Sequence, residues 1–522
     1  MHKPIMMLCI GLTLAACASP MRYEVAEKSI AELQADLGAG AVTSEVLVMA
    51  YLERIAALDD AGPELNAVLA LNPNAVADGR ALDTERQAGQ VRGPLHGVPI
   101  LVKDNIETAD PMPTTAGSIA LAENVTGRDA PAIARLRAAG AIILGKTNLS
   151  EWANIRSSSS TSGWSALGGF TKNPYALDRN PCGSSSGSGA AAAASLAAAA
   201  IGTETDGSVV CPAAINGLVG IKPTVGLVSR SRIIPISASQ DTAGPMARSV
   251  EDAAILLTAM SGGDPGDAAT SEADARRSDY AAALDAGALA GARIGAARFL
   301  TGYHAETDAR FETALATLRA AGAEIVELDE GPDEGAIGEA EIVVLLAELK
   351  AGLDAYLADA APAVATRSFS SVIEFNAASA AELEYFGQEL FEMAQAGPSL
   401  ADPAYREALA TSKRLAGPEG LDPLLADNRL DAIVAPTTGP AWTTDAVNGD
   451  HYAGSATTLP AVAGYPHVTV PMGVASGLPV GLSFIGPAWT ESRLIALAYA
   501  YEQATLARTS PTYVAQSPAG VD

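Results

Sequence analysis

An alanine run between two loops rich in serine and glycine constrains this fold more than any other feature. The first loop is Pro181-Cys-Gly-Ser-Ser-Ser-Gly-Ser-Gly189, and the second is Gly202-Thr-Glu-Thr-Asp-Gly-Ser208. Alanine is the best helix former, and its small side chain allows close packing of neighbouring backbone. We therefore predict a helix over 190–200 that sets the separation of Ser184 and Ser208.

Helical and strand-like segments alternate through the first third of the chain. Apolar spacing predicts helices within 30–57, with a helix start at Thr43-Ser44-Glu45 between them. Residues 98–102 form a short apolar strand that ends at Lys103. A helix over 130–139 precedes a buried strand at 141–144, with Gly140 between them. This alternation indicates an α/β fold whose sheet is covered by helices.

The composition changes after Ser249 and changes again near residue 430. Residues of about 250–430 are dominated by Ala, Glu, Asp and Leu, with helical spacing at 309–321 and 342–357. We interpret this stretch as a helical layer on the sheet that shapes a specificity pocket. Strands at 432–436, 468–471 and 480–486 and a helix at 491–504 complete a single domain over 18–522.

The N-terminus carries an export signal. Lys3 gives a basic start, residues 5–16 are apolar but too short to span a bilayer, and Leu14-Ala-Ala-Cys17 resembles a bacterial lipobox. We expect a signal peptide with lipobox over 1–17 that is cleaved before Cys17, so that Cys17 becomes the lipidated N-terminus of a periplasmic protein anchored in the outer membrane. The alternative is an ordinary cleaved signal with a chance cysteine.

The net charge of −27 argues against nucleic acid as a partner, because so acidic a surface repels phosphate backbones. Contact with a membrane is expected only through the anchor. The sequence leaves the oligomeric state open.

Two of the four cysteines remain beside the serine loops after export. Cys182 precedes Ser184 and Cys211 follows Ser208. An oxidising periplasm permits a disulfide between them, but the sequence does not show that they are close enough. We therefore favour two buried free thiols.

A serine nucleophile needs a base, and no histidine of this chain stands in a clear catalytic context. Lys103 follows directly on an apolar strand, and burial lowers a lysine pKa enough for it to act as a base. Lys146 and Lys222 are alternatives by residue type. A phosphate-binding loop is a weak interpretation, because Gly-Lys-Ser/Thr is missing.

The motifs around these residues resemble the amidase signature family. They are Gly97-Val-Pro-Ile-Leu-Val-Lys103-Asp104, the two serine loops, Gly217-x-x-Gly-Ile-Lys-Pro-Thr224, and Gly464-Tyr-Pro-His-Val-Thr-Val-Pro471. The resemblance spans about 28–506, with a core block at about 97–230. It implies a mixed central sheet between helices. The sequence around Trp164 and Asn180 is most similar to that of bacterial peptide amidases, which release ammonia from C-terminal carboxamides.

The resemblance implies a role for each matched position. Ser208 corresponds to the nucleophile, Ser184 to a relay serine whose preceding peptide bond is cis, and Lys103 to the base. Backbone N–H groups of Thr205, Asp206, Gly207 and Ser208 correspond to the oxyanion hole. No metal or organic cofactor is implied. Gly207 is the position of this turn that we expect to need backbone freedom.

Asp206 departs from the commoner family pattern, which has glycine at this position. Its carboxylate either bonds the amides of its own turn or accepts a hydrogen bond from the carboxamide NH₂ of the substrate. Trp152 and Trp164 could line the pocket, although core packing is the interpretation that we favour.

The sequence therefore predicts a serine-dependent amide hydrolase acting on a peptide or small-molecule carboxamide. The first alternative is a general acyl or aryl amidase that cleaves substituted amides. Export and the lack of a basic patch argue against the glutaminyl-tRNA amidotransferase component of the same family. A catalytically silent scaffold lipoprotein is the alternative from another class.

Overall fold

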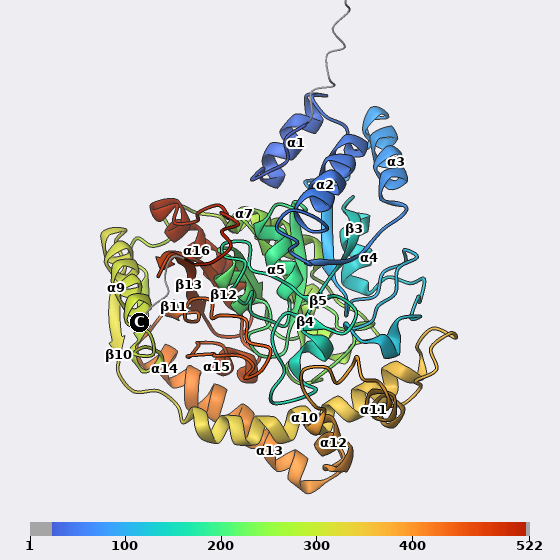
Figure 1. Ribbon diagram of the computed structural model, residues 1–522. Helices are drawn as coiled ribbons and strands as arrows, with labels where there is room; N and C mark the ends of the chain where they lie inside the picture. The colour runs from blue at the N-terminus through green and yellow to red at the C-terminus, as the bar shows by residue number, and fades with distance from the viewer. Residues whose placement is uncertain (1–22, 518–522) are drawn as a thin grey trace, which may run out of the picture.

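A mixed sheet of eleven strands forms the centre of the molecule (Figure 1). The computed structural model describes residues 23–517. The strand order is β1-β3-β2-β6-β8-β7-β12-β13-β11-β9-β10, and β4 and β5 form a separate hairpin. The mixed α/β/α architecture predicted from the sequence is confirmed.

The strands are β1 Val68–Leu71, β2 Pro99–Lys103, β3 Ile142–Thr147, β4 Trp164–Ser165, β5 Gly169–Phe170, β6 Ala199–Glu204, β7 Val219–Lys222, β8 Thr242–Ala247, β9 Arg293–Ala297, β10 Glu324–Leu328, β11 Ala432–Pro436, β12 His467–Ala475 and β13 Leu478–Ile485. The α-helices are α1 Ile30–Gly38, α2 Ser44–Leu58, α3 Ala75–Gln87, α4 Pro131–Ala138, α5 Ser186–Ala193, α6 Val210–Ile215, α7 Val250–Met260, α8 Ala273–Arg276, α9 Ala305–Ala320, α10 Glu334–Ala358, α11 Phe369–Ala378, α12 Glu389–Ala396, α13 Pro403–Ala416, α14 Asp422–Asp427, α15 Thr458–Ala463 and α16 Glu491–Thr505.

Two parallel groups of three strands lie within the sheet, and antiparallel pairs join them. Strands β3, β2 and β6 run parallel, as do β11, β9 and β10. Helix α4 makes the crossover from β2 to β3, which is the connection that parallel strands require. Every residue of β2, β3 and β6 is buried. A polar side chain at the end of any of these strands is therefore withdrawn from water.

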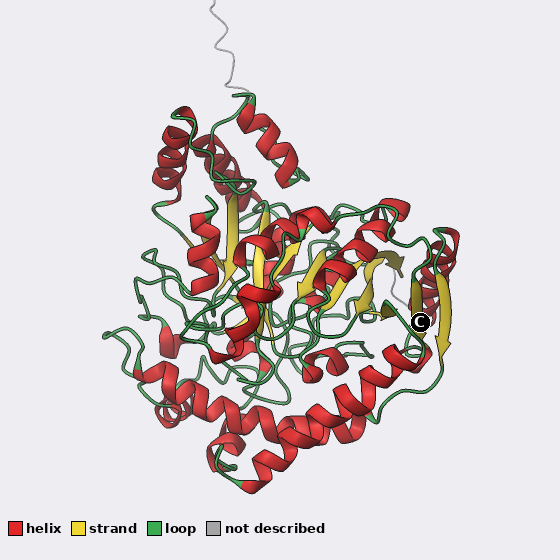
Figure 2. Cartoon of the chain, turned by 180° about the vertical axis from the view of Figure 1, so that it is seen from behind, coloured by secondary structure: helices red, strands yellow, loops and turns green. Residues whose placement is uncertain are grey.

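Helices cover both faces of the sheet (Figure 2). Helix α5 packs on β2, β6 and β8, and α7 and α16 pack on the antiparallel strands. The first two helices begin as the sequence predicts, because Thr43 caps α2 by accepting a hydrogen bond from the Val46 amide. The predicted helices at 130–139 and 491–504, and the predicted tail strands, are also present.

The alanine run is helical only over 190–193, so the helix predicted over 190–200 is wrong from residue 194 onward. Helix α5 ends at Ala193, Ser195 adopts a positive φ of 55°, and β6 begins at Ala199. Strand β6 lies between β2 and β8 and supplies ladder hydrogen bonds to both. The pairing at the sheet centre overrides the helix propensity of alanine.

The stretch of 250–430 differs from the predicted helical layer in two respects. It contains β9 and β10, which extend the sheet at one edge. Its long helices α10 and α13 pack on each other along one end of the molecule and do not cover a sheet face (Figure 1). Both strands are only five residues long, and neither shows the alternation of polar and apolar residues that would have revealed it in the sequence.

Within residues 23–517, no helix is both long and apolar enough to cross a membrane. The predicted signal segment and Cys17 lie outside the described residues.

Candidate active site

Lys103 is fully buried at the end of β2, where the sheet delivers it to the serine loops. Its Nζ lies 2.8 Å from Ser184 Oγ, 2.8 Å from Thr203 Oγ1 and 3.2 Å from the Thr203 carbonyl oxygen. Asn105 Nδ2 donates to the same Thr203 hydroxyl at 2.9 Å. The lysine amine is thus held between a serine hydroxyl and the neighbouring strand β6.

Burial lowers the pKa of Lys103 to about 7. The negative charges of Asp241 and Glu204 act in the opposite direction and raise this pKa, but the loss of hydration is the larger effect. A large fraction of the amine is therefore neutral near pH 7, where an exposed lysine would be almost wholly protonated.

The loop that carries Ser184 is fastened to β6 by its neighbouring serine. The Gly183–Ser184 peptide bond is cis, as the family resemblance implied. Ser185 Oγ donates to the Thr203 carbonyl at 3.1 Å and accepts from the Thr203 amide at 3.2 Å. Gly202 allows this approach, because a Cβ there would lie 2.7 Å from Ser185 Oγ.

The turn 205–208 lies against this loop. The Ser185 amide donates to the Ser208 carbonyl at 3.2 Å, which joins the two serine-bearing segments. Gly207 has a φ of +76°, so the predicted need for backbone freedom at this position is confirmed. Within the described part of the chain, no protein group accepts from the backbone N–H groups of 205–208. These donors remain available to a ligand.

Glu204 supports the far end of this turn, a function that the sequence did not suggest. Its Oε2 accepts hydrogen bonds from the Val209 amide at 2.8 Å and the Val210 amide at 3.0 Å. Burial raises the pKa of Glu204, and the positive charge of Lys222 lowers it. An acidic residue directly before a serine turn and a helix start was the available signal.

Two chambers lie beside the serine segments. The nucleophile chamber, of about 360 Å³, is lined by Ser208, Asp206, Trp442 and Tyr452 among others. The lysine-side chamber, of about 390 Å³, is lined by Ser184, by apolar residues that include Ile234, and by charged residues that include Arg230 and Glu348. Both volumes are in the range of small-molecule sites. Thr205, Ile236 and Ala153 line both chambers, which therefore adjoin.

Asp206 does not bond the amides of its own turn. Its Oδ2 accepts from the Thr458 hydroxyl at 2.8 Å, while its buried Oδ1 has no hydrogen-bond partner among the described residues. Burial raises the pKa of this carboxyl. The more conservative of the two sequence interpretations is thus wrong, because α15 supplies a hydroxyl partner that local spacing does not reveal.

Cys182 and Cys211 form a disulfide, so the prediction of two free thiols is wrong. Their Cα atoms lie 6.1 Å apart because α5 and β6 return the chain to its starting point. This distance arises from the tertiary fold and is not visible in the sequence. The bond joins the loop of Ser184 to the turn of Ser208 and lines the nucleophile chamber.

The alternative lysine bases do not contact either serine. Lys146 Nζ donates to the Ile106 carbonyl at 2.6 Å and to the Thr114 hydroxyl at 2.7 Å. Lys222 Nζ donates to the Pro223 carbonyl at 3.3 Å. Within residues 23–517, no cluster of His, Cys, Asp and Glu side chains could hold a metal ion.

The aromatic lining of the nucleophile chamber was missed by sequence reasoning. Trp152 and Trp164 pack in the core, against Phe391 and Phe386 respectively. Trp442 and Tyr452 line the chamber instead, from the loop of 437–457 that follows β11. Two aromatic residues in a loop rich in Gly and Thr were the only signal.

The family model for amidases matches residues 46–495. The chain belongs to the amidase family. This amidase is therefore a hydrolase of amide bonds, and the motif resemblance is confirmed.

Solved structures of peptide amidases are similar to this amidase over almost the whole chain. It is 54% identical to native peptide amidase from Stenotrophomonas maltophilia, with a TM-score of 0.89 over 94% of this chain and 99% of that one. A peptide amidase in complex with the competitive inhibitor chymostatin is 55% identical, with a TM-score of 0.90 over 93% and 99% of the chains.

Curated relatives include other members of the family. A probable amidase of Arabidopsis thaliana is 40% identical over 94% of this chain and 93% of the relative. A component of the glutamyl-tRNA(Gln) amidotransferase of Salinispora arenicola is 36% identical over 92% of this chain and 98% of the relative.

Proposed function

We propose that this amidase hydrolyses the C-terminal carboxamide of peptides through an acyl-Ser208 intermediate. The observation that carries the proposal is the 2.8 Å contact between buried Lys103 and Ser184, in a loop bonded to the Ser208 turn. This contact supports a relay in which a base, a hydroxyl and a second serine act in order beside two adjoining chambers.

The neutral amine of Lys103 has one lone pair and two N–H bonds. It accepts the Ser184 proton while donating to the two oxygens of Thr203. Ser184 in turn takes the proton of Ser208 as Ser208 Oγ attacks the carbonyl carbon.

The C–N bond then breaks, and Ser184 gives its proton to the departing nitrogen while Lys103 returns one to Ser184. Water attacks the ester carbon and gives a proton to the relay. The C–O bond to Ser208 breaks, Ser208 recovers its proton, and a carboxylic acid leaves.

The turn 205–208 stabilises the charge that develops on the carbonyl oxygen. Its backbone N–H groups have no acceptor among the described residues and are held in place by the disulfide and by Glu204. Donors fixed in advance favour the oxyanion over the neutral carbonyl, and each is worth about 10²–10³ in rate.

Asp206 selects the carboxamide. Its unpartnered Oδ1 accepts an N–H of the substrate amide, and its negative charge repels a free C-terminal carboxylate. Asp206→Asn should therefore raise KM for a peptide amide. Kinetics equal to those of the wild type would remove Asp206 from substrate recognition.

A labelling experiment and a substrate panel test the proposal together. A fluorophosphonate should label the wild type and fail to label Ser208→Ala. In a panel of peptide amides, fatty amides and anilides, the peptide amides should be hydrolysed fastest, with ammonia as their product. Equal labelling of Ser208→Ala would refute the nucleophile, and a preference for anilides would refute the substrate class.

The lysine-side chamber supports a second candidate, the cleavage of substituted amides. It is lined by Ser184, the group that protonates the leaving nitrogen, and by Ile233, Ile234, Ile236 and Leu400. An apolar amine portion would fit such a lining. Anilide hydrolysis in the same panel measures this activity directly.

We also propose that the protein is exported and anchored through Cys17. The lipobox-like sequence supports export, and so does the disulfide, because disulfides persist mainly in oxidising compartments. Cys17→Ser should shift the protein from the membrane fraction to the soluble fraction. Equal membrane association of this variant would refute the lipid anchor.

A further inference from the structure

We propose that Trp442 and Tyr452 form a subsite for the side chain of the residue that bears the carboxamide, and that this subsite selects aromatic and large apolar side chains. The inference rests on the proposed function, since it assigns a substrate preference to that same reaction.

The covalent chemistry decides which chamber receives this side chain. In the intermediate the acyl carbon is bonded to Ser208 Oγ, so the group attached to that carbon must occupy space next to Ser208. Ser208 lines the nucleophile chamber and is absent from the lining of the lysine-side chamber. The acyl residue therefore extends into the chamber that contains Trp442 and Tyr452.

The two rings form an aromatic wall of this chamber. Their centroids lie 5.7 Å apart with the planes at 84°, an edge-to-face pair. Ile155, Ile236 and Leu345 contribute further apolar lining. Trp442 is 9% exposed, whereas Tyr452 is 44% exposed. The buried ring offers a fixed surface, and a bound side chain would cover the exposed ring.

Trp442 is fixed relative to the catalytic loop. Its indole Nε1 donates to Asp450 Oδ1 at 3.2 Å, and Asp450 also accepts from the Ser162 amide at 3.1 Å. The backbone amide of Asn180 donates to the Trp442 carbonyl at 2.8 Å, and Asn180 lies in the loop that leads to Ser184. The position of the aromatic wall is thus tied to the position of the serines.

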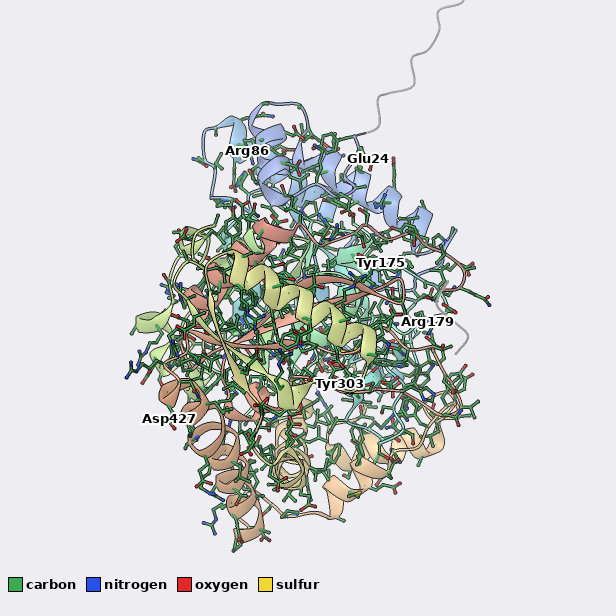
Figure 3. The ribbon with its side chains drawn as sticks, turned by 90° about the vertical axis from the view of Figure 1, so that its left-hand side faces the viewer. Glu24, Arg86, Tyr175, Arg179, Tyr303 and Asp427 are labelled. Carbon is green, nitrogen blue, oxygen red and sulfur yellow. A yellow bond between two sulfur atoms is a disulfide. The ribbon has the colours of Figure 1, made fainter. Side chains whose placement is uncertain are left out.

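The loop that carries Tyr452 also packs against the ring of Tyr303. Tyr303 lies so close to Gly454 that a Cβ there would be 2.6 Å from the tyrosine ring. Figure 3 labels Tyr303 near the centre of the view, with Glu24 and Arg86 toward the top and Asp427 toward the bottom. The glycine therefore allows the loop to lie directly against an aromatic surface.

The chamber offers no cationic partner to an acidic side chain. Its titratable lining includes the carboxyl groups of Asp206 and Asp450 and, within the described residues, no Lys, Arg or His. Both carboxyl oxygens of Asp450 already accept hydrogen bonds, from the Trp442 indole and the Ser162 amide. Apart from Ser208 and Asp206, the surface offered to the acyl residue combines the apolar side chains with uncharged polar ones such as Asn154, Ser455 and Thr457.

Steady-state kinetics on two dipeptide amides with the same first residue, one ending in Phe-NH₂ and one in Gly-NH₂, test the subsite. The wild type should favour the Phe amide. In Trp442→Ala the ratio of kcat/KM for Phe amide to Gly amide should fall about tenfold to a hundredfold, as expected for the lost burial of an aromatic ring. Tyr452→Ala should lower the ratio by a smaller factor, because its ring is more exposed.

Tyr385→Ala is the matched control, because Tyr385 is 37% exposed and also makes an edge contact, with Trp164, away from both chambers. Its ratio should equal that of the wild type. Fluorophosphonate labelling of Ser208 shows that each variant keeps a working site. A ratio unchanged in both Trp442→Ala and Tyr452→Ala would overturn the subsite, while a wild type that hydrolyses neither amide would refute the proposed function itself.

Discussion

The pH dependence of turnover gives the sharpest test of Lys103 as the base. The proposed mechanism needs the neutral amine, so kcat/KM should rise with pH as Lys103 loses its proton. Burial lowers its pKa to about 7, and the limb of the profile should be centred there.

The magnitude follows from this value. With a pKa of about 7, roughly 9% of the amine is neutral at pH 6 and roughly 91% at pH 8, so kcat/KM should increase about tenfold across that interval. An unshifted lysine with a pKa of about 10.4 would be only about 0.04% neutral at pH 7, and its limb would lie above pH 9.

A charge variant tests the direction of the electrostatic effect on Lys103. The negative charge of Asp241 raises the Lys103 pKa, so Asp241→Asn should move the limb to lower pH. Asp252→Asn is the matched control. Asp252 is also buried and accepts a backbone hydrogen bond, from Ile30, but its charge does not contribute to the Lys103 pKa. The limb should not move in this control.

The assay is ammonia release at low substrate concentration between pH 5 and pH 10, since kcat/KM reports the free enzyme. A flat profile, or a limb above pH 9 in the wild type, would refute Lys103 as the base. A shift of the Asp241→Asn limb to higher pH would refute the electrostatic reasoning.

Three further predictions concern the segments around the serines. Ser208→Ala should lower kcat by at least about 10³-fold with the melting temperature retained, and a variant with appreciable turnover would contradict the nucleophile. Replacing both Cys182 and Cys211 by Ser should cost about 3–4 kcal/mol in the free energy of unfolding, given the separation of 29 residues, and reductant should destabilise only the wild type in denaturant titrations. Glu204→Gln should reduce kcat about tenfold to a hundredfold by weakening the support of the serine turn, and equal kcat values would show that the turn needs no such support.

Much of the fold could be predicted from the sequence, because its buried strands and amphipathic helices have clear hydrophobic periodicities. Strand β2 and helices α4 and α16 illustrate this. The conformation of the alanine run could not be predicted, because alanine alone does not distinguish a helix from a strand at the centre of a sheet. The stretch 199–204 becomes a strand only because β2 and β8 lie on either side of it.

In the candidate site, too, local motifs could be predicted from the sequence and long-range contacts could not. Lys103, Ser184 and Ser208 were predicted from local motifs, and the structure brings the loops that carry them together. The disulfide and the Thr458 partner of Asp206 depend on contacts between segments distant in the chain. Such contacts leave no periodic or local pattern in a single sequence.

The placement of the N-terminal helices has a consequence for orientation. Helices α1 to α3 lie at one end of the molecule, and α10, whose residues line both chambers, lies at the opposite end (Figure 1). A chain tethered through Cys17 would hold its first helices nearest the bilayer. The α10 side of both chambers would then face away from the lipid, toward solutes diffusing through the surrounding compartment and not toward molecules embedded in the membrane.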